Sequence, residues 1–148
     1  MKILVINGPN LNMLGTREPE IYGCETLDDI NKELSDFSKT LSKDIEIDFY
    51  QSNTEGEIID KIQNSKKYKG LIINPAAYTH TSIAIADAIK GAGITAVEVH
   101  LSNIHAREEY RKKSFISPVS MGVVAGFGKN SYKLALLGLY KHFCKNNE

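Results

Sequence analysis

Short apolar runs alternate with amphipathic helical patterns along this 148-residue chain. The first run, Ile3–Ile6, is continuously apolar, which predicts a strand over Lys2–Asn7 that is covered on both faces. Apolar residues then recur at helical spacing from Leu27 to Leu41, after a Thr26–Asp29 pair typical of a helix N-terminus. The same alternation predicts strands at Ile45–Tyr50, Gly70–Asn74, Ile94–Leu101 and Met121–Ala125, and helices at Glu57–Lys66, Thr79–Lys90 and Ser131–Phe143.

Alternating strands and helices predict an α/β fold, in which right-handed crossovers connect parallel strands and place helices on both faces. The second predicted strand has one polar face, which suits the edge of a sheet. We therefore expect a flavodoxin-like three-layer sandwich with a five-stranded parallel sheet of order 2-1-3-4-5. Ligands bind such sheets at the carboxyl edge, in the crevice between strands one and three. No linker or repeat interrupts the sequence, so we expect a single domain over residues 1–148.

Charge and cysteine content exclude several classes of protein. Acidic and basic residues number 18 each, whereas nucleic-acid binding needs a clustered positive excess. A net charge of zero favours self-association. Cys24 and Cys144 form no CxxC pair, and no histidine is spaced to complete a zinc site. With no long apolar segment, these features predict a reduced, cytoplasmic protein without a membrane partner.

A long segment, Asn7–Gly23, follows the first predicted strand and contains two prolines and three glycines. Segments of this length in compact proteins are binding loops, lids or disordered stretches. Apolar residues such as Leu11, Met13 and Leu14 argue against disorder. We therefore predict a functional loop, a lid over about residues 8–24.

Polar residues follow each of the first four predicted strands. They are Asn10 after strand one, Gln51–Asn53 after strand two, Asn74–His80 after strand three and Glu98–Asn103 after strand four. Carboxyl ends of parallel strands share one edge, so these side chains should gather there. The alternative for each asparagine is a turn role, because asparagine tolerates left-handed backbone.

Glu98 and His100 are two residues apart in a predicted strand and should therefore share a face. Burying an acid beside an imidazole is costly unless the two groups satisfy each other or a ligand. A carboxylate behind a histidine sets its tautomer and favours its protonated form, so the pair is a candidate general acid. A purely structural Glu–His pair is the alternative.

Arg107 and Arg111 are four residues apart and would share one face of a helical turn. Their place after the fourth strand favours anion binding, although a solvated charged face is the alternative. His105 and His142 are expected on the surface. No lysine occurs in apolar company at a strand end, so a Schiff-base mechanism has no candidate, and no cluster of ligands predicts a metal.

Four sequence blocks resemble the type II 3-dehydroquinate dehydratase family, and they occur in the family's order. They are Asn7–Pro19 with Ile21–Gly23, Gln51–Gly56, Ile73–Ser82 and Val97–Glu109. The resemblance implies a flavodoxin-like subunit assembled as trimers into a dodecamer. It also implies the dehydration of 3-dehydroquinate to 3-dehydroshikimate without a cofactor, in aromatic biosynthesis or quinate breakdown.

The resemblance assigns catalytic roles to residues of the long loop and of strand four. Tyr22 matches the general base, and Arg17 would favour its phenolate, with Arg107 as a second cation. Asn10 matches the position that holds a water against the enolate oxygen. His100 matches the proton donor to the leaving hydroxyl, with Glu98 behind it.

The resemblance also implies how the substrate is bound. Its carboxylate would lie against Asn74 and the Leu101–Ser102 segment, and His80 and Arg111 would bind ring hydroxyls. Asp87, in the third predicted helix, matches an acid that reaches the site of a neighbouring subunit.

The main alternative function is a flavodoxin-like module that binds FMN or a phosphate ligand. Such a module would use a loop rich in glycine and hydroxyl groups after strand one. The loop here carries asparagine, proline, leucine and arginine instead, with Thr16 as its hydroxyl. A scaffold protein without chemistry would leave the Glu98–His100 pair unexplained.

Overall fold

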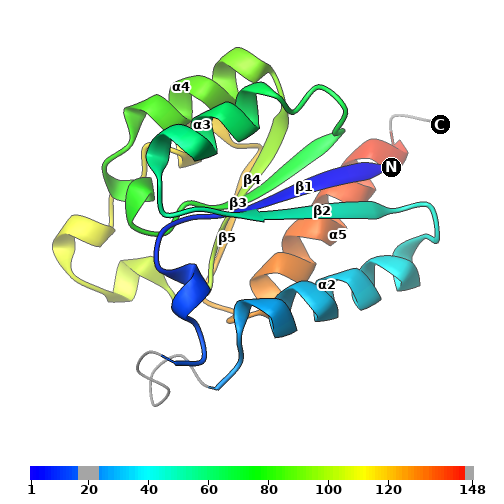
Figure 1. Cartoon of the computed structure of the whole chain (residues 1–148), viewed down its shortest axis with the longest axis horizontal. Helices are drawn as coiled ribbons and strands as arrows, with labels where there is room; N and C mark the ends of the chain where they lie inside the picture. The colour runs from blue at the N-terminus through cyan, green and yellow to red at the C-terminus, as the bar shows by residue number, and fades with distance from the viewer. Residues whose placement is uncertain (17–23, 146–148) are drawn as a thin grey trace.

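A parallel five-stranded sheet forms the centre of the computed structural model, which describes residues 1–16 and 24–145 (Figure 1). The strands are β1 (Lys2–Asn7), β2 (Glu46–Gln51), β3 (Gly70–Asn74), β4 (Thr95–His100) and β5 (Gly122–Ala125). Their order is β2-β1-β3-β4-β5, with β2 at an edge. The predicted flavodoxin-like order is therefore confirmed.

Helices cover both faces of this sheet (Figure 1). On one face lie α3 (Glu55–Gln63) and α4 (Ile83–Ala92), and on the other lie α2 (Leu27–Leu41) and α5 (Asn130–Lys145). Side chains alternate along a strand, so β1 contributes Leu4 and Ile6 to the first core cluster and Ile3 and Val5 to the second. This two-sided burial explains the unbroken apolar run at the start of the sequence.

Local capping accounts for where α2 begins. The Thr26 hydroxyl accepts a hydrogen bond from the Asp29 backbone N–H at 3.2 Å, and the Thr26 N–H donates to Asp29 Oδ2 at 2.9 Å. Each side chain thus satisfies a backbone donor at the helix start. The predicted N-terminus of this helix is confirmed.

The helix predicted over Thr79–Lys90, with Gly91 or Gly93 expected to end it, was wrong at its start, whereas its end at Gly93 is confirmed. A short 3-10 helix occupies Ala76–His80, and α4 starts only at Ile83, where the Ser82 hydroxyl accepts from the Ile85 N–H at 2.9 Å. The helix continues to Ala92 and ends at Gly93, whose φ of 64° is left-handed. The apolar spacing alone did not reveal that Ser82 caps a new helix.

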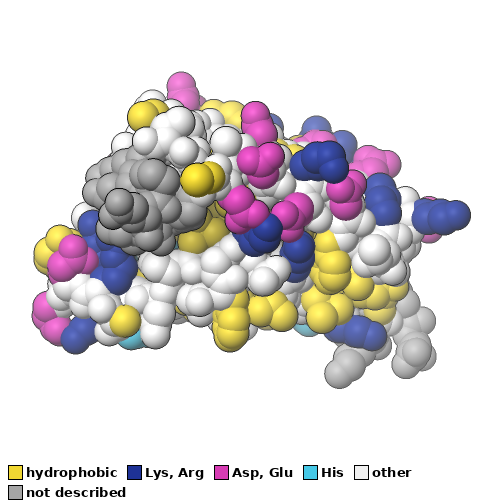
Figure 2. Space-filling view, turned by 90° about the horizontal axis from the view of Figure 1, so that it is seen from below, with side chains coloured by type: hydrophobic (Ala, Val, Ile, Leu, Met, Phe, Trp, Pro, Cys, Tyr) yellow, Lys and Arg dark blue, Asp and Glu magenta, His cyan; other side chains and the backbone are white. Residues whose placement is uncertain are grey.

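The other boundary differences are smaller. Helix α3 starts at Glu55 and ends at Gln63, earlier than the predicted Glu57–Lys66, and α5 is longer than predicted at each end. In the described part of the chain, no helix is long and apolar enough to cross a membrane. Figure 2 shows acidic and basic side chains interspersed on one face, in keeping with the balanced composition.

Candidate active site

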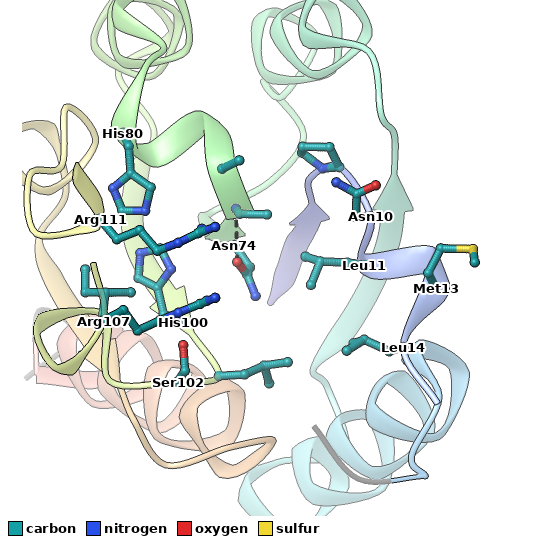
Figure 3. A pocket seen from close by; sticks show the side chains of 15 residues that line it. Asn10, Leu11, Met13, Leu14, Asn74, His80, His100, Ser102, Arg107 and Arg111 are labelled. Atoms are coloured by element: carbon teal, nitrogen blue, oxygen red, sulfur yellow. Dashed lines mark hydrogen bonds between the residues drawn. The ribbon is translucent and has the colours of Figure 1, made fainter. Parts of the chain in front are cut away.

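A cavity of about 250 Å³ opens at the carboxyl edge of the sheet, between the loops that follow β1, β3 and β4 (Figure 3). The predicted residues that line it are Asn10, Asn74, His80, His100, Leu101, Ser102, Arg107 and Arg111. Polar residues that follow β1, β3 and β4 therefore share one cavity, whereas Gln51–Asn53 after β2 are not among its lining residues.

The loops after β1 and β3 cross at very close range at the base of the cavity. The Gly8 N–H donates to the Asn74 carbonyl oxygen at 2.8 Å. A Cβ atom at Gly8 would lie 2.4 Å from the Pro75 carbonyl oxygen, closer than any side chain tolerates. Glycine is therefore required here.

Residues after β2 hold the β1 loop in place instead of lining the cavity. Asn10 has a left-handed backbone with a φ of 68°, and its N–H donates to Asn53 Oδ1 at 2.9 Å. Gln51 Nε2 donates to the Gly8 carbonyl at 3.2 Å and to Asn53 Oδ1 at 3.1 Å. The left-handed turn suits asparagine, yet the same residue faces the cavity, so the turn role and the site role coincide.

His100 and Glu98 form the buried pair that the strand spacing predicts. His100 Nε2 lies 2.8 Å from Glu98 Oε1, and the Glu98 side chain is fully buried. Because the carboxylate accepts, Nε2 carries the hydrogen, and Nδ1 is the nitrogen left for a ligand. The negative charge lies where it offsets the positive charge of a proton-donating imidazolium.

Three hydroxyl groups complete the surroundings of the Glu98 carboxylate. Thr79 Oγ1 donates to Oε1 at 2.9 Å, Ser114 Oγ lies 2.9 and 3.0 Å from the two oxygens, and Ser117 Oγ donates to Oε2. Burial works to raise the pKa of Glu98, but the hydrogen bonds from His100 and Ser117 outweigh it and lower that pKa below its usual value. Glu98 is therefore a buried anion that acts only as an acceptor.

His80 is held beside His100 by a backbone group. Its Nδ1 lies 2.7 Å from the Lys113 carbonyl oxygen, which can only accept, so Nδ1 carries a hydrogen. The two imidazole rings stack with centroids 6.5 Å apart and an angle of 17° between their planes. The cavity wall thus presents two histidines with different, separately determined hydrogen-bonding roles (Figure 3).

Two arginines enter the cavity from the side opposite Asn10 and Met13 (Figure 3). The predicted single helical turn was wrong, because Ile104–Ala106 and Glu109–Arg111 are separate 3-10 helices. Glu108 lies between the guanidinium groups, with its Oε2 2.9 Å from Arg111 Nε and 3.7 Å from Arg107 Nε. A shared carboxylate reduces their mutual repulsion, so both cations can face one anionic ligand.

Two predicted residues lie outside the described part of the chain, and a third lies elsewhere on the molecule. Tyr22 and Arg17 lie outside the described residues, as does the middle of the predicted lid. At the described ends of that segment, Gly15 has a φ of 83°, and a Cβ there would lie 2.9 Å from the Cys24 carbonyl oxygen. Asp87 is exposed on α4, in a separate groove between α3 and α4.

Sequence reasoning missed several supporting residues. The hydroxyls of Thr79, Ser114 and Ser117 had no sequence pattern that would connect them to Glu98. The cavity also has an apolar side, formed in part by Leu11, Met13 and Leu14, whose only indication was the apolar character of the long loop. Within residues 1–16 and 24–145, no group of three or more potential metal ligands occurs.

Comparisons with known proteins identify the family of this chain. The family model for dehydroquinase class II matches residues 1–140. A 3-dehydroquinate dehydratase from Geotalea daltonii is 58% identical over 146 residues, covering 98% of this chain and 100% of the relative. One from Helicobacter hepaticus is 59% identical, covering 94% of this chain and 88% of the relative.

Solved structures give the same result. The type II dehydroquinase from Butyrivibrio crossotus superposes with a TM-score of 0.89 at 48% identity, covering 94% of this chain and 97% of that one. The type II dehydroquinase from Propionibacterium acnes gives a TM-score of 0.86 at 42% identity, covering 95% and 96%. The chain therefore belongs to the class II dehydroquinase family.

Proposed function

We propose that this protein is a hydro-lyase that dehydrates 3-dehydroquinate to 3-dehydroshikimate, in the shikimate pathway or in quinate catabolism. The family match and the names of the relatives support this activity over an FMN-binding module. The observation that carries the proposal is the buried Glu98–His100 pair beside two arginines. It combines a prepared proton donor with cations for an anionic substrate.

The proposed chemistry is an anti elimination in two proton-transfer steps. A base removes the C2 proton, and the electron pair moves onto the ketone oxygen to give an enolate. The enolate then re-forms the ketone as the C1–oxygen bond breaks, and an acid protonates the departing hydroxyl to release water. The atoms balance without an oxidant, a reductant or a co-reactant.

We assign the base to Tyr22 and the acid to His100. Arg17 would favour the phenolate of Tyr22, because an adjacent guanidinium stabilises an anion, and Arg107 is a second cation near the cavity. Asn10 would hold a water against the enolate oxygen. The family resemblance supports these roles, and Tyr22 and Arg17 lie outside the described residues.

Hydrogen-bond donors in the cavity suggest how the substrate is oriented. The substrate carboxylate would lie against Asn74 and the Leu101–Ser102 segment, where side-chain and backbone N–H groups can donate. His80 and Arg111 would bind ring hydroxyls. These residues line one cavity with His100, so one ligand can reach all of them.

We further propose that the active form is a homo-oligomer, a dodecamer of trimers in which Asp87 reaches a neighbouring site. Asp87 is exposed on α4 and lines a groove separate from the cavity of its own chain, and a net charge of zero does not oppose association. Sedimentation velocity should show a species many times heavier than the 16.4 kDa chain. A fully active monomer would refute the shared-site proposal.

The activity itself is tested by the absorbance of the conjugated enone product after 3-dehydroquinate is added to the purified protein. Turnover should persist in EDTA and after borohydride treatment with substrate. Substrate carrying deuterium at a single C2 position distinguishes anti from syn elimination by label retention in the product. No enone from the wild-type protein would sink the proposed function.

A further inference from the structure

Three buried polar side chains form a hydrogen-bonded chain beneath the cavity. Asn7 ends β1, Asn74 ends the neighbouring β3 at the paired position, and Tyr132 lies in the first part of α5. The Tyr132 hydroxyl donates to Asn7 Oδ1 at 2.6 Å and accepts from Asn74 Nδ2 at 2.9 Å. Asn7 and Tyr132 are fully buried, whereas Asn74 also lines the cavity.

The direction of this chain follows from a single backbone group. The Ala76 N–H, which can only donate, bonds Asn74 Oδ1 at 3.2 Å (Figure 3). The Asn74 amide nitrogen must therefore face the Tyr132 oxygen, and the Tyr132 proton must go to Asn7. Burial raises the pKa of the Tyr132 hydroxyl, so it keeps that proton. The orientations of both side-chain amides in this hydrogen-bonded chain are thereby determined.

This orientation decides what Asn74 offers to a ligand. One hydrogen of its amide nitrogen goes to Tyr132, and the other remains for an acceptor in the cavity. Asn74 consequently presents a donor and not an acceptor, which suits a carboxylate oxygen. If the amide rotated by half a turn, its oxygen would face the same region and repel an anion.

The hydrogen-bonded chain also leaves one buried amide nitrogen without a partner. Asn7 Nδ2 is buried and has no hydrogen-bond partner among the described residues, which costs about 1–3 kcal/mol. Optimal stability would favour an arrangement without that orphaned donor. Asn7 Nδ2 lies at one end of the hydrogen-bonded chain, and the cavity-facing amide of Asn74 lies at the other.

We propose that Tyr132 is a positioning residue that orients the Asn74 amide to bind the substrate carboxylate. The inference rests on the proposed function, in which that carboxylate lies against Asn74. Asn74 would bind ground state and transition state alike, so its misorientation should raise KM more than it lowers kcat.

The test begins with Tyr132→Phe, which keeps the ring and its packing. KM for 3-dehydroquinate should rise about 5- to 20-fold, the effect of weakening one hydrogen bond to a charged group, with kcat little changed. In an Asn74→Ala background the same substitution should have no further effect on KM. An unchanged KM, or an effect that persists in that background, would overturn the proposal.

Two further variants separate positioning from general loss of a buried hydroxyl. Tyr68→Phe removes a tyrosine hydroxyl that donates at 2.6 Å to Asp48, at the opposite edge of the sheet, and should leave KM unchanged. Asn7→Ala removes the acceptor of the Tyr132 proton, keeps the Tyr132 ring, and should raise KM through the same hydrogen-bonded chain. Asn7→Ala tests the same proposal if Tyr132→Phe does not fold.

A readout without substrate separates this inference from the proposed function. The side-chain amide NMR signals of Asn74, identified by their loss in Asn74→Ala, should shift in Tyr132→Phe and not in Tyr68→Phe. Unshifted signals refute positioning by Tyr132 whether or not the wild-type protein is a dehydratase. Absent wild-type turnover refutes the proposed function alone, because the NMR result still decides the positioning.

Discussion

The amino edge of the sheet, where the strands begin, and the carboxyl edge, where they end, differ in how their buried polar groups are bonded. A tyrosine at each of these edges shows the difference. At the amino edge the Tyr68 hydroxyl bonds Asp48, which is 39% exposed and also pairs with Lys2 at 3.2 Å. At the carboxyl edge the Tyr132 hydroxyl joins two asparagines away from solvent, and a buried donor remains unpaired. Water can reach Asp48 if it loses a partner, but it cannot reach Asn7 or Tyr132, which are fully buried.

This difference shows at which edge of the sheet the fold tolerates the free-energy cost of burying polar groups. Ion pairs at the amino edge are open to solvent and contribute modestly, because water and salt screen them. At the carboxyl edge, Glu98 remains a buried anion only because four donors surround it. Polar groups at the amino edge thus serve stability, whereas those at the carboxyl edge hold chemical groups in defined orientations.

The largest expected effect tests whether the carboxyl edge performs the chemistry. His100→Ala should lower kcat by about 10²–10⁴-fold, because it removes the proposed proton donor to the leaving hydroxyl. His105→Ala is the matched control, since His105 is exposed and its backbone N–H, which the substitution keeps, donates to Asn103 Oδ1 at 3.1 Å. Steady-state kinetics measure both variants. Equal losses in the two would refute the assignment of the acid.

The next effect tests the crossing that holds the two loops together. Gly8→Ala should lower the free energy of unfolding by about 2–3 kcal/mol, because its Cβ would collide with the Pro75 carbonyl. Gly138→Ala, on the exposed side of α5 with no atom within 4 Å of the added Cβ, should instead raise it by about 0.5–1 kcal/mol. Urea unfolding measures both changes. A neutral Gly8→Ala would mean that the loops can separate without cost.

A smaller effect tests the hydroxyl groups around Glu98. Ser117→Ala should lower the free energy of unfolding by about 1.5–2 kcal/mol at neutral pH, because it removes a hydrogen bond to a buried charge. The pKa of Glu98 is lowered in the folded state, so its contribution is present above the unfolded pKa and is lost as pH falls through the folded one.

The variant raises the folded-state pKa of Glu98, so its acid destabilisation should begin at a higher pH than in the wild type. Ser120→Ala is the control, because Ser120 Oγ donates at 2.9 Å to the Ile116 carbonyl and not to Glu98. Urea titrations at a series of acidic pH values measure the shift. Identical acid profiles for the two variants would contradict the role given to Ser117.

The smallest effect concerns the amino edge. Tyr68→Phe should cost about 1 kcal/mol at neutral pH, the net value of one hydrogen bond. Burial, followed by the hydrogen bond to Asp48, raises the pKa of Tyr68 to about 12. The stability that this tyrosine contributes is therefore complete below its unfolded pKa and is lost as pH rises from about 10 toward 12.

The stability gap between wild type and Tyr68→Phe should accordingly narrow in alkaline solution. Thermal unfolding at pH values on both sides of that range measures the gap. A gap that stays constant through the alkaline range would show that the hydroxyl does not hold its proton through contact with Asp48.

Local patterns predicted most of the fold. The capping box of α2 and the buried strand β3 depend on neighbouring residues, so their limits were correct. The 3-10 helix at Ala76–His80 depends on contacts between distant segments, because the Tyr78 hydroxyl donates to the Asn53 carbonyl at 2.7 Å and the Phe115 N–H donates to the Thr79 carbonyl at 2.9 Å. Periodicity cannot reveal such a contact.

The site was likewise predictable where its residues are close in the sequence. Strand alternation was enough to pair Glu98 with His100, since the two side chains share a strand. Thr79 and Ser117 reach Glu98 from sequence separations of 19 residues on either side, and Tyr132 reaches Asn74 across 58. Their roles depend on tertiary packing, which a single sequence does not encode in any local pattern.

The contact that holds His80 has a consequence for how this enzyme can vary. Its partner is the main-chain carbonyl of Lys113, so the imidazole is oriented by a group that every amino acid carries. Substitutions at that exposed position can change surface charge without disturbing the ring, provided that they leave the backbone path intact. A proline that redirected this path would be expected to act on the cavity although its own side chain never enters it. Tolerance to substitution at this position therefore depends on the path of the backbone and not on the identity of the side chain.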